Sequence, residues 1–322
     1  MNAHEVNEII QCMPEGRTVF HYFKDRYALG LLANYVSEPT PLRMVKQSRY
    51  GGLLNKYAVQ RAVANCVDGT LSSDQLHSVW PLNPKAFVLS LGRWGERSRY
   101  AYTQTSRTGF NLVLHLNFSN EHNARYRELL NVKGRSPFTY MGHPNDSRGR
   151  NTMAWARMDI DLARGEVLIE EIQNDWLRNS RQHLEWLNQC TNRGEKWSTI
   201  KRRYPFNWPM YEGVRSTRAL LTYLEHCVSP YERIWDEAML YATIWFLQSE
   251  LGIHRIFYNT LETGCRMKGI DLDFAPPRSI YSSLPKRFCF EQTEEYPENI
   301  DYRVARAKKK FRKPMRWYLL EL

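Results

Sequence analysis

The sequence lacks several features that would assign a protein to a class at once. Its six cysteines lie far apart and include no C-x-x-C pair, which argues against a zinc ribbon and a thioredoxin-type site. It has no run of about 18 apolar residues, the length that a membrane helix needs. It also begins without the basic and apolar segments of an export signal. We therefore expect a cytoplasmic protein with reduced cysteines and no membrane partner.

Repeats and low-complexity tracts are absent too, and the composition is that of a folded chain. Aromatic residues make up 13% of the 322 residues, whereas disordered chains are poor in them. A chain of this length can bury a large core, either as one big domain or as two smaller ones.

Positive charge is in excess. The formal net charge is +11, from 45 Lys and Arg against 34 Asp and Glu, and this favours acidic partners, nucleic acid first. Two basic clusters lie at 193–208 and 303–316, and the second contains no acid. The first cluster interleaves basic with aromatic residues: Arg202, Arg203, Trp197, Tyr204 and Trp208. Each cluster is either a solvated face or a phosphate-binding surface with aromatic stacking positions.

Hydrophobic periodicity divides the chain into three parts. Residues 1–80 are predicted to be mostly helical, because apolar residues from Tyr22 to Tyr35 recur at three- and four-residue steps. Residues 81–300 are predicted to form an α+β core domain, with a polar, aromatic insertion or lid near 177–213. Residues 301–322 are predicted to be a basic C-terminal tail.

The clearest elements lie in the core domain. Met153–Ile160 and Val167–Ile172 are joined by a short Gly-bearing turn and predict a hairpin. Tyr231–Leu251 is apolar nearly all round, as an interior helix is, and Gly252 stands where a helix cap is expected. Ile253–Tyr258 then reads as a strand that should run parallel to the second hairpin strand. We expect an α+β fold in which a mixed sheet contains a buried crossover helix.

The one motif of the chain is the run Glu-Glu-Ile-Gln-Asn-Asp-Trp at Glu170–Trp176. Side chains alternate along a strand, so Glu171 and Gln173 are expected on one face and Glu170 and Ile172 on the other. At least one of the two glutamates should be partly buried. A buried carboxylate needs a partner or changes its pKa, and such positions are often functional.

We place the candidate catalytic site at the C-terminal end of this strand. Glu171 would act as general base or metal ligand, Gln173 as an orienting amide, and Asp175 as a second carboxylate or a helix cap. Trp176 would either stack on a substrate or cap the core. His143, in a polar loop, is a candidate proton carrier. The residues expected to bind the substrate are Trp176, His143, Arg148, Arg202 and Arg203.

A metal-dependent nuclease is an alternative for the same segment. Asp161, Glu171 and Gln173 follow the order of the PD-(D/E)XK nucleases, with glutamine in place of the usual lysine. In such enzymes an Asp and a Glu on adjacent strands hold Mg²⁺, and the third residue helps to place the attacking water. The plain alternative is that Asp161 lies on a solvated flank of the hairpin.

The segment Ser136–Trp176 resembles a domain of the large polyvalent proteins of phages and conjugative elements, whose signature reads roughly E-I-Q-S-D-W. Asn174 stands where the family usually has Ser. The matching pieces are Gly142-His143-Pro144, Asn151, Ala154-Trp155-Ala156-Arg157, Gly165 and Glu170–Trp176, with 235–251, 253–259 and 280–287 downstream. The likeness covers about residues 136–295 and implies a kind of domain rather than a reaction.

The order of hairpin, buried helix and parallel strand also resembles the second half of a GNAT-type acetyltransferase. In that family a helix N-terminus binds the pyrophosphate of acetyl-CoA through backbone N–H groups, after a Gly-rich loop. Here only the isolated Gly194 and Gly213 lie between the signature strand and the buried helix. The resemblance therefore implies a GNAT-like architecture without ordinary use of acetyl-CoA.

Two classes of function follow from the sequence. As an enzyme, the protein would carry out a group-transfer or phosphodiester reaction on an acidic macromolecule. As a binding module, it would hold nucleic acid through the basic tail and the Trp-rich insertion, and the acids of the hairpin would be structural. The sequence assigns neither a cofactor, nor a resident metal, nor an oligomeric state.

Overall fold

The structure is a computed structural model of the 322-residue chain. It describes residues 1–12, 18–66, 68–95, 104–132, 136–140, 142–146, 148–203, 213–214, 216–271, 277–311 and 314–322. For residues 201–203, 310 and 311 the description covers the backbone only.

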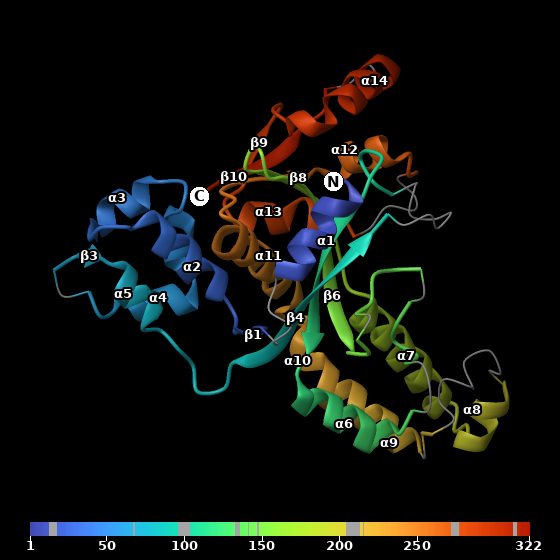
Figure 1. Ribbon diagram of the computed structural model, residues 1–322. Coiled ribbons are helices and arrows are strands. Elements are labelled where there is room, and N and C mark those ends of the chain that lie inside the picture. The colour runs from blue at the N-terminus through green and yellow to red at the C-terminus, as the bar shows by residue number, and fades with distance from the viewer. Residues whose placement is uncertain are drawn as a thin grey trace.

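An eight-stranded mixed sheet organises the molecule, in the order β1-β4-β5-β6-β7-β8-β10-β9 (Figure 1). Strands β7 and β8 are parallel, and every other neighbouring pair is antiparallel. The strands are β1 (Thr18–Tyr22), β4 (Lys85–Trp94), β5 (Asn111–Phe118), β6 (Thr152–Asp161), β7 (Glu166–Gln173), β8 (Arg255–Asn259), β9 (Glu291–Thr293) and β10 (Trp317–Glu321). The predicted α+β class with a large mixed sheet is confirmed.

The predicted crossover unit is present. The hairpin β6–β7 is antiparallel, and β7 leads through several helices to β8, its parallel neighbour. The last long helix of that connection, α11 (Trp235–Leu251), is buried along most of its length, because its sequence is apolar on every side. It ends at Gly252, whose φ of 63° is the left-handed conformation that a glycine adopts without steric cost.

The N-terminal part is mostly helical, as predicted, but Thr18–Tyr22 forms a strand. Phe20 and Tyr22 belong to strand β1, which pairs with β4 at one edge of the sheet. The β-branched and aromatic run from Thr18 explains the strand, and Asp25, with a φ of 65°, separates it from the following helix. The helices are α1 (Ala3–Cys12), α2 (Arg26–Tyr35), α3 (Leu42–Gln47), α4 (Tyr57–Val63) and α5 (Ser73–His77), with the 3₁₀ helix η1 (Gly51–Asn55) and the short strand pair β2 (Thr40–Pro41) and β3 (Thr70–Leu71).

The stretch after β7 is more regular than the predicted insertion or lid. It begins with the 18-residue helix α7 (Asp175–Asn192), followed by α8 (Trp197–Arg203), while residues 204–212 lie outside the description. Further helices complete this end of the molecule, below the sheet in Figure 1. They are α6 (Asn120–Leu130), α9 (Thr217–Thr222), the π-helix η4 (Tyr223–Val228) and α10 (Ser229–Glu232).

The basic stretch 301–322 is built into the fold rather than extending from it as a tail. Its first part is α14 (Asp301–Phe311), and its last part is β10, which lies between β8 and β9. Val304 and Ala307 of α14 contact a small apolar cluster on the sheet that includes Leu168 and Trp317. The elements between β8 and α14 are α12 (Leu261–Lys268), η6 (Arg278–Tyr281), α13 (Ser283–Arg287) and η7 (Glu298–Ile300).

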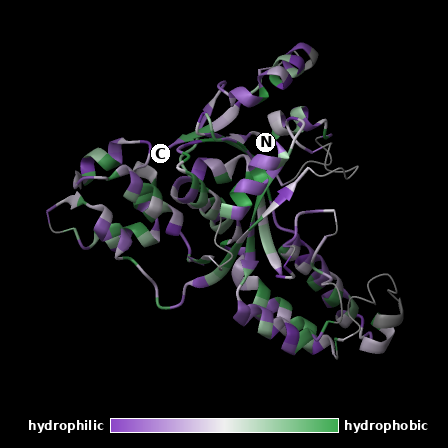
Figure 2. Cartoon of the chain, viewed as in Figure 1, coloured by the Kyte–Doolittle hydropathy of each residue, from purple (hydrophilic) through white to green (hydrophobic). Residues whose placement is uncertain are grey.

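The two faces of the central strands differ in polarity. On β6, Ala156 and Met158 belong to the main apolar core, whereas the alternate residues Arg157 and Asp159 are outside it and point to the opposite face. In Figure 2 the centre of the sheet is largely green, whereas α14 carries much purple. Among the residues described, none of the helices combines the length and the apolar character that a membrane span requires.

A β-bulge changes the expected orientation of the signature strand. Met158 pairs with Ile169, but Arg157 pairs with Glu171, so β7 has one extra residue at Glu170. Ile169 and Ile172 both belong to the main core, three residues apart instead of two. The prediction that Glu170 shares a face with Ile172 is therefore wrong: the bulge turns Glu170 and Glu171 to the same, polar face.

Candidate active site

The polar face carries a fully buried guanidinium. Arg157 has 0% of its side chain exposed and forms an ion pair with Glu171, the residue directly across the hairpin. Its Nη2 also donates to the carbonyl of Gln104 at 2.9 Å, and its guanidinium lies between the rings of Trp94 and Trp155. A buried cation needs a carboxylate partner, and Glu171 supplies it.

This pairing changes the role that Glu171 can have. Burial by itself would raise the pKa of Glu171, but the Arg157 and Lys268 cations outweigh burial and hold the pKa below its ordinary value. A carboxylate that is ionised and bound to arginine is a poor acceptor of a substrate proton. The geometry favours Glu171 as the anchor of Arg157.

Glu170 is buried beside it in a second charged group. Its carboxylate accepts from the Ser106 backbone N–H at 2.7 Å and from the Ser106 hydroxyl at 2.8 Å. Lys268, 4% exposed, places its Nζ 3.4 Å from the same carboxylate. The two glutamates of the signature are thus each matched by a cation from another element.

Histidine and aspartate meet at the end of β7. His143 Nδ1 lies 2.9 Å from both carboxylate oxygens of Asp175, the first residue of α7. The Asp175 carboxylate also accepts from the Trp155 indole N–H at 3.3 Å and from Arg178 at 2.5 Å. These donors hold Asp175 in place, and Asp175 in turn fixes the imidazole so that Nδ1 donates to it.

The N-cap of α7 is the residue before Asp175. The Asn174 side chain accepts from the backbone N–H of Leu177 at 2.8 Å, so Asn174 is the N-cap. The alternative that Asp175 is the helix cap is therefore wrong, and its carboxylate faces His143 instead.

Gln173 joins the two halves of the site. In one orientation its carboxamide nitrogen makes only a 3.4 Å contact with Asp175. We assign the opposite orientation, in which that nitrogen donates to Glu171 at 3.2 Å and the oxygen accepts from Arg178 at 2.8 Å, because it satisfies both neighbours. Gln173 then links Glu171 to Arg178, and its predicted role as an orienting amide stays a prediction.

Not every predicted residue reaches this site. Trp176 is fully buried, and its ring contacts Phe118, Tyr126 and Phe138, so it belongs to the core and offers no face to a substrate. Arg148 is exposed in the loop that carries His143. The side chains of Arg202 and Arg203 lie outside the description.

The nuclease array is not assembled. Asp161 pairs across the hairpin with Glu166, whereas Glu171 pairs with Arg157. Four residues of extended strand separate the two positions, which is about 13 Å at 3.3 Å per residue. Asp161 bonds instead to Arg164 at 3.0 Å. One magnesium ion cannot bind both carboxylates across this distance, and no group of metal-ligating side chains is found in the described part of the chain.

Several buried polar atoms on this face lack a hydrogen-bond partner. Within the described residues, the unpaired groups on β4, β5 and β6 are Trp94 Nε1, Asn111 Oδ1, His115 Nε2, and Arg157 Nε and Nη1. Unpaired buried polar atoms are uncommon in structures and concentrate where function requires them. None of the unpaired atoms on these three strands lies on the apolar face.

The sequence contains one signal of this site that the motif search overlooks. Arg157 is the only basic residue in the run Met153–Ile160, which is apolar except for Arg157 and Asp159. An arginine inside a buried strand requires an acid on a neighbouring strand. That rule points to the acids of the second hairpin strand, and the bulge makes Glu171 the partner.

No protein-family model, curated protein or solved structure matches this chain. The interpretation of the site therefore depends on its own geometry.

Proposed function

We propose that the protein is an enzyme that transfers a group to or from an acidic macromolecule, nucleic acid first, with His143 as its proton-transfer residue. The contact between His143 and Asp175 carries this proposal. His143 is 16% exposed on its side chain, so its second ring nitrogen can reach a substrate, whereas Glu171 is committed to Arg157. We therefore assign the role of general base, which the sequence gives to Glu171, to His143.

The surrounding charges support this division of roles. Asp175 accepts the Nδ1 hydrogen, which leaves the Nε2 lone pair to take a proton from a substrate hydroxyl or amine. Arg178, 44% exposed, lies beside the pair and can contact a phosphate or carboxylate of the substrate. Exposed Arg148 lies on the same loop as His143 and can extend that contact.

A GNAT-like architecture is part of the proposal, and the order of β6, β7, α11 and β8 supports it. The helix termini nevertheless argue against acetyl-CoA. The first turn of α11 contains Asp236 and Glu237, and α7 begins with Asp175. Carboxylates at these positions compete with a pyrophosphate for the helix N-terminus. We expect calorimetry to detect no binding of acetyl-CoA.

A nucleic-acid-binding module without catalysis is the second candidate, and α14 favours it. Tyr302, Arg306 and Lys309 lie at positions i, i+4 and i+7, on one side of the helix. Tyr302 is 76% exposed, and both basic residues are exposed without a carboxylate partner among the described residues. An exposed aromatic ring in line with two free cations fits a single strand, through base stacking and phosphate contacts.

One experiment separates the two candidates. The protein is mixed with a labelled single-stranded oligonucleotide and a panel of compounds that each carry an activated group for transfer. The intact mass of the oligonucleotide is then followed over time. We expect a mass change that Asp175→Asn slows by about 10²- to 10⁴-fold, the usual contribution of acid–base catalysis. Asp161→Asn, an acid on the same hairpin, is the matched control and should leave the rate unchanged. Binding without a mass change for any donor would reject the enzyme in favour of the module.

A further inference from the structure

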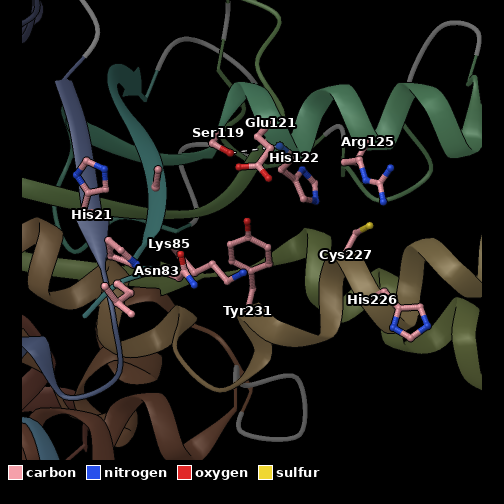
Figure 3. A pocket seen from close by; sticks show the side chains of 13 residues that line it. His21, Asn83, Lys85, Ser119, Glu121, His122, Arg125, His226, Cys227 and Tyr231 are labelled. Atoms are coloured by element: carbon pink, nitrogen blue, oxygen red, sulfur yellow. Dashed lines mark hydrogen bonds between the residues drawn. The ribbon is translucent and has the colours of Figure 1, made fainter. Parts of the chain in front are cut away.

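A pocket separate from the β7 site opens at the end of the sheet. It has a volume of about 620 Å³ and is lined by the start of β4, the N-terminal turn of α6, η4 and α10 (Figure 3). This volume is in the range of small-molecule sites. The polar side chains of its wall include Lys85, Glu121, His122 and Arg125.

His122 forms part of this wall and is nearly buried, with 5% exposed. Its Nε2 lies 3.3 Å from the hydroxyl of Tyr223, whose oxygen accepts from the indole N–H of Trp176 at 3.0 Å. Burial lowers the pKa of His122 to about 3, against a smaller opposing effect of Asn123, so the ring is neutral. A neutral imidazole carries one hydrogen, and the network decides which nitrogen has it.

We assign that hydrogen to Nδ1. If Tyr223 donates to Nε2, every group of the chain from Trp176 to His122 is satisfied. The opposite assignment would leave the buried Tyr223 hydrogen without an acceptor among the described residues. The Nδ1–H group has no hydrogen bond of good geometry among the described residues, although the Asn123 side chain is near enough to raise the pKa of the ring slightly. A buried donor without an acceptor is costly and points to an acceptor from outside the chain.

Positive charge surrounds this donor. The Lys85 ammonium lies 5.5 Å from the centre of the Tyr231 ring, and no carboxylate of the described residues is within ion-pair distance of it. Among the residues that the structure describes, Arg125 forms an ion pair only with the exposed Glu128, at 3.0 Å. The 11-residue helix α6 also begins at the pocket, where Ser119 Oγ caps the backbone N–H of His122 at 3.2 Å and Glu121 lies in the first turn.

We propose that this pocket binds a small phosphate ester that also carries hydroxyl or amino groups. The phosphate oxygens would accept from Lys85 and from His122 Nδ1. The Glu121 carboxylate, which also lines the pocket, would accept from the ligand's hydroxyl or amino groups. Glu121 repels a bare anion, so an ester with donors should bind more tightly than inorganic phosphate. This site is independent of the function proposed for the end of β7.

Calorimetry tests the proposal with glycerol 3-phosphate, inorganic phosphate and glycerol as separate titrants. We expect one binding site for glycerol 3-phosphate, weaker binding of phosphate and none of glycerol. Lys85→Met should weaken the binding of glycerol 3-phosphate by about tenfold or more, because one charged hydrogen bond is lost. Lys46→Met, at an exposed position of α3, is the control and should change nothing. Thermal unfolding verifies that both variants are folded.

Tyr223→Phe tests the part assigned to His122. Without the Tyr223 hydroxyl, the ring is free to move its hydrogen to Nε2, and binding should weaken although no charge is lost. Unchanged affinity in this variant would overturn the role of His122. Absence of binding by the wild type, or equal affinities for the Lys85→Met and Lys46→Met variants, would overturn the pocket as a phosphate-ester site.

Discussion

The two faces of the central hairpin are built from alternate residues of the same strands, yet different physics stabilises them. One face packs Ala156, Met158 and Ile169 against the apolar core. The other buries Arg157 and Glu171 as an ion pair. On the apolar face the stability comes from volume and contact area, whereas on the polar face it depends on each charge keeping its partner. The unpaired polar atoms lie on the second face and the partly exposed His143 lies at its end, which is why we place the chemistry there.

The apolar face should be the more sensitive to a loss of volume. Phe246 on α11 is fully buried, so Phe246→Ala should destabilise the protein by about 3–5 kcal/mol through lost burial and a cavity. Urea unfolding followed by circular dichroism measures this. Ser249→Ala, on the exposed side of the same helix, should stay within about 0.5 kcal/mol. Similar losses for the two variants would mean that α11 is not a core helix.

The polar face should be sensitive to unpairing rather than to volume. Arg157→Met leaves the Glu171 carboxylate buried without its cation and should cost about 3–5 kcal/mol. Adding Glu171→Gln removes the unpaired buried charge, so the double variant should recover most of the lost stability. A double-mutant cycle by urea unfolding gives the coupling between the two residues. Additive losses would show that the ion pair does not stabilise this face.

Acid should weaken the polar face through His115, a buried residue of β5. Burial lowers the pKa of His115 to about 4 from an ordinary value of 6.5, so the folded state keeps it neutral while the unfolded chain binds a proton. Its stabilising effect is complete above pH 6.5 and is lost as the pH falls toward 4, at about 1.4 kcal/mol per pH unit.

His115→Gln should remove that part of the pH dependence, as seen in unfolding free energies measured from pH 7 to 4. His4→Gln, at an exposed position, serves as the control. An unchanged slope in His115→Gln would show that this histidine is not held neutral by the fold.

The smallest effect on stability is expected at the surface of α14. Arg306→Gln with Lys309→Gln should change the unfolding free energy by less than about 0.5 kcal/mol. Oligonucleotide binding should nevertheless depend less on salt. The slope of log K against log salt should decrease in magnitude by about 1.4, because two phosphate contacts are lost.

Fluorescence anisotropy measures that slope. The matched control is Arg43→Gln with Lys46→Gln, two exposed residues at the same spacing on α3. Equal effects of the two double variants would show that α14 is not a specific nucleic-acid surface.

Local periodicity was enough to predict the centre of the fold. The two runs 153–160 and 167–172, joined by a short Gly-bearing turn, and the all-round apolar helix at 231–251 predict a hairpin and a crossover, and both are present. Strands β1 and β10 were missed because their partners, β4 and β8, lie more than 50 residues away in the sequence. Pairing over such distances is decided by tertiary contacts, which local patterns do not contain.

The site was predicted less completely than the fold. His143 and Asp175 were both candidates, but a separation of 32 residues through a loop gives no sequence signal that they touch. The bulge at Glu170 reverses one side chain and cannot be read from the strand's alternation. Trp176 in the motif proved to be a core residue, since a tryptophan has the same sequence signature in a core as in a stacking site.

The most direct test of the account is the reactivity of His143 toward diethylpyrocarbonate, mapped by peptide mass with and without a single-stranded oligonucleotide. We predict that His143 is modified while the buried His115 and His122 are not, and that the oligonucleotide slows modification at His143 but not at exposed His4. If His143 reacts as slowly as His115, or if the oligonucleotide leaves its rate unchanged, the end of β7 is not where this protein meets an acidic substrate.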